Sequence, residues 1–169
     1  MRAPIRTCAG FTALEMLITM LVLAVILVIA VPSFQQMIRN QGIKTASFDL
    51  FSALEYTRSE AIKRPGNIVT LCAGDSTAND GAWAKGWRLV ISPCSSDPLR
   101  TWTTASSLII SDKAGGATSI TFGKDGHVMS PATAPKLQMD PAVSPAGVSS
   151  RCVQISLAGR PNTLVGACP

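Results

Sequence analysis

Residues 1–34 read MRAPIRTCAGFTALEMLITMLVLAVILVIAVPSF, and this stretch decides how the rest of the chain is organised. A short basic leader ends at Gly10. The next 21 residues, 11–31, are almost entirely apolar, and their only polar members are Thr12, Glu15 and Thr19. At about 1.5 Å per residue, a helix of this length spans about 30 Å, the thickness of one bilayer core. We therefore predict a single membrane-spanning helix over residues 11–31.

The charges that flank this run predict its orientation. Arg2 and Arg6 precede the run, and the next basic residue is Arg39. Because basic residues stay on the cytoplasmic side, the N-terminus is expected in the cytoplasm and the later residues outside. A secretory signal peptide has a shorter apolar core, about 7–15 residues, and a small-x-small cleavage site. Val31-Pro32-Ser33 is a poor site of that kind, so the run is interpreted as a retained anchor.

Glu15 is an unusual residue in such an anchor. An ionised carboxylate inside lipid is costly unless it is paired or reaches water. One interpretation is that Glu15, close to the cytoplasmic end, extends to the headgroups. The other is that it pairs with a free amine at Phe11, which cleavage after Gly10 would create. In an assembly of several chains, that amine can belong to a neighbouring subunit.

The arrangement of Gly10, Phe11 and Glu15 resembles the class III signal of type IV pilins and type II secretion pseudopilins. The resemblance implies that a prepilin peptidase cuts after Gly10 and methylates the new N-terminal Phe11. It also implies that Glu15, the fifth mature residue, guides assembly of the filament. Pro32 would be the twenty-second mature residue, where many pilins have a proline.

Size and charge limit the part of the chain that lies beyond the anchor. The chain has 169 residues, enough for one modest globular domain beside the helix. Beyond Pro32, 13 basic residues stand against 9 acidic ones, and no basic run is longer than Lys63-Arg64. A dedicated nucleic-acid-binding surface has clustered Lys and Arg. The charge therefore permits contact with DNA or an anionic surface but does not demand it.

The cysteines predict two disulfides. Of the five, Cys8 lies in the leader, and the other four lie beyond the anchor, in an oxidising compartment. Local hairpin geometry favours Cys72–Cys94 and Cys152–Cys168 among the three possible pairings. A structural zinc site would need CxxC spacing or more than the one histidine present. No metal and no cofactor is therefore expected.

The remaining sequence predicts a long helix followed by short strands, which is an α+β fold. Apolar residues continue at helical spacing past Pro32, and Pro65-Gly66 ends the helix, so the helix is expected over 11–64. Residues 65–169 form a β-rich globular part, with a tight hairpin at Lys124-Asp125-Gly126. The segment 131–145 holds four prolines and is expected to be a loop, although a short candidate strand falls inside it. The candidate strands are Asn67–Ala73, Gly86–Ser92, Arg100–Thr104, Leu108–Ser111, Ser119–Gly123, His127–Met129, Lys136–Met139, Cys152–Leu157 and Thr163–Gly166.

Four features extend the resemblance along the chain. They are Arg58–Arg64 followed by the strand Val69–Cys72, the pair Trp83…Gly86-Trp87, Phe122-Gly123…Gly126, and Gly159-Arg160 after a late strand. Together they resemble the GspH/FimT family of minor pilins and pseudopilins, which includes FimU-like proteins. The resemblance implies a long pilin helix packed on a β-rich part, and a minor type IV pilin that helps to initiate pilus assembly at or near the tip.

The resemblance leaves two alternative functions. One is a type II secretion pseudopilin of the GspH kind, and the other is a DNA-binding competence pilin of the FimT kind. DNA-binding members have a Gly-Arg-x-Arg motif, which would assign phosphate contact to Arg160. Asn162 stands where the second arginine of that motif would be, and this departure argues against DNA uptake.

The chain contains no pattern typical of an enzyme, and no catalytic residue is assigned. His127 is the only histidine and is expected on an exposed strand. The loop with Asp75, Asn79 and Asp80 does not have EF-hand spacing, so turn formation explains it better than calcium binding. Trp83 and Trp87 are expected to pack against the helix, with a stacking surface for nucleic acid as the alternative.

The resemblance also implies partners and a location. The partners are other minor and major pilins, the prepilin peptidase and the assembly platform of the inner membrane. The protein is expected to cross the inner membrane once, with residues 65–169 in the periplasm, and to be incorporated into a pilus or pseudopilus.

Overall fold

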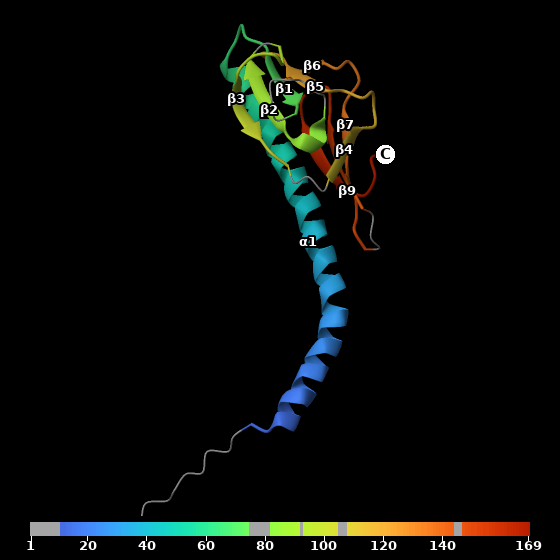
Figure 1. Ribbon diagram of the computed structural model, residues 1–169. Helices are drawn as coiled ribbons and strands as arrows, with labels where there is room; N and C mark the ends of the chain where they lie inside the picture. The colour runs from blue at the N-terminus through green and yellow to red at the C-terminus, as the bar shows by residue number, and fades with distance from the viewer. Residues whose placement is uncertain (1–10, 75–81, 92, 105–107, 144–146) are drawn as a thin grey trace, which may run out of the picture. The chain divides into compact units, whose positions relative to one another are not determined.

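The structure is a computed structural model that describes residues 11–74, 82–91, 93–104, 108–143 and 147–169. The chain divides into two compact units, Met1–Met37 and Ile38–Pro169. We call the second unit the head. One helix, α1, contributes to both units, and the strands β1 to β9 all belong to the head (Figure 1).

Helix α1 spans Ala13–Lys63 and continues through Pro32. Its 51 residues correspond to a length of about 75 Å. Within the head, one face of α1 is buried, and its buried residues recur three or four positions apart, as in an amphipathic helix. Two buried hydroxyls on this face are satisfied by the helix itself, since Thr57 donates to the Ala53 carbonyl at 2.6 Å and Ser47 to the Lys44 carbonyl at 2.7 Å. The buried residues are Ile43, Ala46, Ser47, Leu50, Ala53, Leu54, Thr57, Glu60 and Ala61.

The first sheet of the head is antiparallel and has the strand order β3-β2-β1-β5-β6. Its central strand, β1 (Val69–Ala73), is buried at every position, as expected for a strand covered on both faces. A short 3-10 turn, η1 (Trp83–Lys85), precedes the second strand. The other strands are β2 (Trp87–Ile91), β3 (Pro98–Trp102), β5 (Ser119–Phe122) and β6 (Val128–Ser130).

The second sheet is also antiparallel, with the order β4-β7-β8-β9. In β7, Leu137 and Met139 are buried while Lys136 and Gln138 between them are half-buried, the alternation of a strand with one face on the core. The strands are β4 (Leu108–Asp112), β7 (Lys136–Pro141), β8 (Arg151–Ile155) and β9 (Pro161–Val165). Residues of α1 and of both sheets form one contiguous apolar core, with Leu50 from α1, Leu71 and Phe122 from the first sheet, and Leu137 and Ile155 from the second.

The β5–β6 hairpin and the β8–β9 turn meet at the last residues of α1, and hydrogen bonds there connect the two sheets. The Arg58 Nε on α1 donates to the Gly126 carbonyl at 3.2 Å, in the β5–β6 hairpin. The Val128 N–H donates to the Leu157 carbonyl at 2.9 Å, in the β8–β9 turn. Gly159 has φ +74°, and a Cβ there would overlap the carbonyl oxygen of Gly126. This position therefore requires glycine for both its conformation and its space.

The predicted α+β class is confirmed, and so is the hairpin at Lys124-Asp125-Gly126, which joins β5 to β6. The helix begins two residues later and ends one residue earlier than expected. Within 131–145 the expectation of a loop is wrong over Lys136–Pro141, where β7 confirms the candidate strand Lys136–Met139. Prolines explain two other shifts: β3 and β9 begin at Pro98 and Pro161, earlier than predicted, because proline is tolerated at the first residue of an edge strand.

Candidate functional site

The start of α1 carries the residues singled out by the sequence. Phe11 is 72% exposed, and Gly10 lies outside the described residues. The Thr12 N–H donates to Glu15 Oε2 at 3.3 Å, and the Glu15 N–H donates back to Thr12 Oγ1 at 3.3 Å. This reciprocal pair is a capping box, which satisfies two backbone donors that the first helical turn leaves without partners. The Glu15 carboxylate thus has a local partner within its own chain.

The apolar run beyond Glu15 can cross a membrane. By length and composition α1 is the one such helix among the described residues, with a mean hydropathy of 2.9 over its most apolar window. The Thr19 hydroxyl donates to the Met16 carbonyl at 2.9 Å, so this polar group is satisfied by the helix itself. In the sequence, Glu15 is the only ionisable side chain between residues 11 and 31.

Two disulfides are present in the head. One joins Cys72, on β1, to Cys94, with Cα atoms 5.8 Å apart. The other joins Cys152, on β8, to Cys168, with Cα atoms 5.0 Å apart. This is the pairing that hairpin geometry favours. Cys72 and Cys152 are fully buried, so the two bonds fasten chain segments onto the interior of the sheets.

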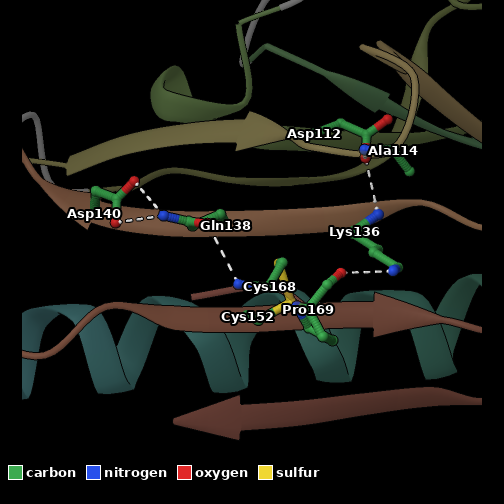
Figure 2. Close-up of a disulfide and its surroundings, with 8 residues drawn as sticks. All are labelled: Asp112, Ala114, Lys136, Gln138, Asp140, Cys152, Cys168 and Pro169. Atoms are coloured by element: carbon green, nitrogen blue, oxygen red, sulfur yellow. Dashed lines mark hydrogen bonds between the residues drawn. A yellow bond between two sulfur atoms is a disulfide. The ribbon is translucent and has the colours of Figure 1, made fainter. Parts of the chain in front are cut away.

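Figure 2 shows how the C-terminal segment lies across the second sheet beside the Cys152–Cys168 disulfide. The Cys168 N–H donates to Gln138 Oε1 at 3.3 Å, and Lys136 Nζ donates to the Pro169 carbonyl at 2.7 Å. The Gln138 amide in turn donates to both carboxylate oxygens of Asp140 at 2.9 Å. Side chains of β7 thereby hold the chain end in place together with the disulfide.

Asp112, at the end of β4, organises the neighbouring turn. Its carboxylate accepts hydrogen bonds from the backbone N–H groups of Ala117 at 2.9 Å and Lys136 at 2.8 Å, and also from those of Ala114 and Gly115. Desolvation by burial raises the pKa of Asp112, but these backbone hydrogen bonds outweigh it and the net pKa lies below the ordinary value. The backbone N–H groups of the turn thus stabilise the ionised carboxylate of Asp112.

Arg160 lies in the exposed turn between β8 and β9. The turn is closed by the Ser156 N–H, which donates to the Arg160 carbonyl at 3.0 Å, and by the Arg160 N–H, which donates to Ser156 Oγ at 3.2 Å. Arg160 lines an open cavity of about 270 Å³ together with Lys136, Gln154 and Asn162. Lys136 therefore lines the same cavity as Arg160, although its Nζ donates to the Pro169 carbonyl, and Asn162 stands in place of a second arginine.

His127 is exposed but precedes β6 instead of lying on it. Its N–H donates to Asp125 Oδ1 at 3.2 Å, and its Nδ1 lies 2.9 Å from Asp125 Oδ2. The backbone hydrogen bond from His127 is the main reason that the pKa of Asp125 lies below its ordinary value. The pair is a turn contact at the surface.

Trp83 and Trp87 are buried, at 2% and 0% exposed, so packing accounts for both and a stacking surface is excluded. The Trp83 indole N–H donates to the Ala117 carbonyl at 2.7 Å. The acidic loop with Asp75, Asn79 and Asp80 lies outside the described residues. Within the described residues, no group of three metal-ligating side chains comes together.

One buried residue, Arg88 on β2, is not predicted by the sequence patterns. It is fully buried, and its guanidinium donates to the carbonyls of Gly74 at 3.1 Å and Cys94 at 2.8 Å, while its Nε is unpartnered. Arg88 is the register partner of Cys72, so it holds the two segments that the Cys72–Cys94 disulfide joins. The signal that could have found it is a charged residue inside the strand-forming run Trp87–Ile91.

Comparisons with known proteins agree with this architecture. The profile of the family described as type II transport protein GspH matches residues 46–159. Two crystal structures of the type IV minor pilin FimU from Pseudomonas aeruginosa (strain PAO1) are similar to this chain, with TM-scores of 0.59 and 0.58 and 26% sequence identity each. The similarity covers 72% of this chain and 87% and 91% of the two FimU chains. No curated protein matches the chain.

Proposed function

The chain belongs to the GspH family of minor pilins and pseudopilins, and from that premise we propose that it is a type IV pilus subunit that helps to initiate assembly at or near the tip. The observation that carries the choice of pilus is the similarity to the minor pilin FimU, which spans most of both chains. The family and fold are those of structural subunits, and the proposed role is accordingly structural and not catalytic.

The proposed mechanism uses the two parts of the chain separately. The prepilin peptidase cuts between Gly10 and Phe11, and α1 then holds the subunit in the inner membrane with the head in the periplasm. On assembly, the apolar half of α1 leaves lipid and packs among the helices of neighbouring pilins. Its apolar surface stays out of water in both states, so extraction does not forfeit the hydrophobic free energy.

Glu15 provides the step that distinguishes the two states. In the single chain its carboxylate is held by the capping box with Thr12. In the filament we expect it to pair with the free amine of a neighbouring Phe11. Opposite charges inside a low-dielectric bundle attract strongly, whereas an unpaired carboxylate there is costly. The pairing therefore favours the assembled state and sets the axial position of the incoming subunit.

The test is to look for the subunit in filaments and to remove it. Mature protein beginning at Phe11 should be recovered from sheared pili by mass spectrometry, at far fewer copies than the major pilin. Deleting the gene should reduce the number of pili without shortening those that remain, as expected for an initiator. Normal pilus numbers in the deletion strain would contradict the initiation role.

A type II secretion pseudopilin is the second candidate, and the family description, type II transport protein GspH, favours it. The two candidates differ in what fails when the gene is deleted. Loss of secreted enzymes from the medium with normal pili would support the pseudopilin. Loss of pili with normal secretion would support the minor pilin.

A DNA-binding competence pilin is the third candidate, and the cavity that Arg160 and Lys136 line supports testing it. A gel-shift titration of the detergent-solubilised mature protein with duplex DNA at several salt concentrations is the test. Binding that weakens with salt and is lost in Arg160→Ala would support this role. Equal retention by wild type and Arg160→Ala would rule out the assigned residue.

A further inference from the structure

Exposed apolar side chains gather at the pole of the head where α1 ends. Ile62, on the last turns of α1, is 50% exposed, Ile68, just before β1, is 51% exposed, and Met129, on β6, is 62% exposed. They belong to one place, because Ile62 lies against Gly126 of the β5–β6 hairpin, while Ile68 and Met129 line the same cavity. We call the group formed by Ile62, Ile68, Met129, Lys124, Asp125 and His127 the end surface.

The end surface is hollowed. Its cavity has a volume of about 380 Å³ and is open to solvent, with Gly66 and Gly123 in its wall beside the apolar side chains. That volume is enough for one large apolar side chain and the backbone that carries it. Exposed apolar clusters with a polar rim are typical of protein–protein contacts.

The pole around this cavity carries more basic than acidic side chains. Lys124 forms no ion pair with an acidic side chain among the described residues, and the Asp125 carboxylate lies 2.9 Å from the His127 imidazole. On the last turns of α1, Glu60 accepts from Arg64 at 2.9 Å and Lys63 at 3.4 Å and is neutralised by them. Among the described residues, this pole has four basic side chains against two acidic ones, Arg58, Lys63, Arg64 and Lys124 against Glu60 and Asp125. A segment that enters the cavity is therefore favoured if it carries a carboxylate next to its apolar side chain.

We propose that the end surface is the docking site for the head of the neighbouring pilin, which inserts an apolar side chain flanked by an acidic residue. This inference rests on the proposed function, since subunits that share one polarity in a filament meet pole to opposite pole. Such a contact is heterologous, and it needs a receptor surface at one pole of each head. The end surface has the shape, the apolar lining and the charge for that role.

The first experiment measures incorporation of exposed-surface variants. Met129→Glu and Ile68→Glu place a carboxylate in the cavity, and Val165→Glu introduces a carboxylate at another exposed apolar position, on β9, at 71%. At equal membrane levels, the two end-surface variants should fall at least tenfold in sheared filaments, and the β9 variant should match wild type. Lys124→Glu should also fall, whereas Lys113→Glu, an exposed lysine elsewhere, should not. Equal incorporation of all the variants would overturn the proposal.

The second experiment identifies the occupant. A photoreactive benzoylphenylalanine is introduced at Met129 and, as the control, at Val165 in the full chain expressed in its own cell, and cross-linked products are identified by mass spectrometry. A pilin joined through position 129 and not through position 165, by an acidic or neighbouring apolar residue of its head, is the expected result. A product with a protein that is not a pilin, with lipid, or with nothing would overturn the proposal.

The two experiments separate this inference from the function on which it rests. If the wild-type chain is found in filaments but position 129 gives no pilin product, the docking site is wrong and the filament role stands. If position 129 joins a pilin while the wild-type chain is absent from filaments, the contact stands and the role in the pilus falls.

Discussion

At the scale of single residues, Glu15 has two possible partners, and they can be separated by substitution. Its carboxylate closes the capping box with Thr12 in the single chain, and it can pair with the Phe11 amine of a neighbour in a filament. A glutamine at the same position can still accept the Thr12 N–H, because capping boxes use Glu or Gln, but it carries no charge.

We expect Glu15→Gln and Glu15→Ala to lower incorporation into sheared filaments to a similar extent, because both lose the charge. Membrane insertion should persist or improve in both, since each removes a carboxylate from the apolar run. The measurement is the ratio of filament to membrane protein by immunoblot. If Glu15→Gln is incorporated as well as the wild type while Glu15→Ala is not, then assembly requires the capping box and not the ion pair.

Asp112 provides a prediction about stability and its pH dependence. Asp112→Ala leaves the N–H groups of Ala117 and Lys136 without their acceptor, and we expect a loss of about 2–3 kcal/mol in the free energy of unfolding. Asp112→Asn, which keeps one acceptor oxygen, should lose less. Urea unfolding followed by tryptophan fluorescence measures both.

The pKa of Asp112 is lower in the folded chain than in the unfolded chain. The unfolded state therefore binds more protons near the unfolded value of about 3.9, and the stabilisation is present above that pH and lost as the pH falls through the folded pKa. Asp112→Asn should be less sensitive to acid over this range than the wild type. An identical acid dependence in the two proteins would contradict this assignment.

Gly159 offers a test of steric fit with a matched control. Gly159 and Gly116 both have positive φ, +74° and +69°, but only Gly159 faces another chain segment at the position of a Cβ. Gly116→Ala should cost about 1 kcal/mol from backbone conformation alone. Gly159→Ala should cost clearly more in thermal unfolding, because it also pushes against Gly126. Equal losses of stability in the two variants would mean that the β8–β9 turn can move away from Gly126 without a cost in free energy.

At the scale of elements, the disulfides fasten a hairpin of each sheet. Cys72–Cys94 closes a separation of 22 residues and Cys152–Cys168 one of 16, and each is expected to stabilise the head by about 3 kcal/mol through loop closure. Non-reducing peptide mapping should recover these two pairs. Crossed pairs would contradict the connectivity, and four free thiols would contradict the framework. The double variant Cys152→Ala/Cys168→Ala should unfold at a lower denaturant concentration than the wild type.

The local sequence pattern of each element explains which strands can be predicted. Strands with apolar alternation, such as β5 and β7, lie within one or two residues of their predicted bounds, because the period-two pattern is local. In the segment 131–145 the four prolines favour a loop, whereas the pattern Lys136–Met139 predicts the strand that is observed as β7. The sheet tolerates Pro141, the last residue of β7, because β8 pairs only with Lys136–Met139 and the ladder on that side has already ended.

At the scale of the whole molecule, processing at the N-terminus decides whether the chain enters the pathway that we propose. We expect the mature protein to begin with methylated Phe11, as measured by N-terminal mass spectrometry. Replacing Gly10 with a bulky residue, as in Gly10→Val, should leave the chain uncut and in the membrane, because the peptidase must accept the residue before the scissile bond. A mature terminus at any other residue would contradict the pilin pathway.

The sequence by itself determined the long apolar helix, the α+β class, the hairpin at Lys124-Asp125-Gly126 and the family resemblance. These depend on neighbours along the chain: an apolar run long enough for a bilayer, a change from helical to alternating spacing, and turn residues between two short strands. Cysteine spacing also favours the pairing seen in the head, because each pair brackets one local segment.

Only the tertiary structure decided how the strands divide between two sheets, that Arg88 is buried opposite Cys72, and that Lys136 and Arg160 line one cavity. It also brought Ile62, Ile68 and Met129 to one pole of the head. Each of these depends on contacts between residues that are far apart in the chain. The free energy of such contacts comes from packing and burial in the folded core, and no local pattern in the sequence records it.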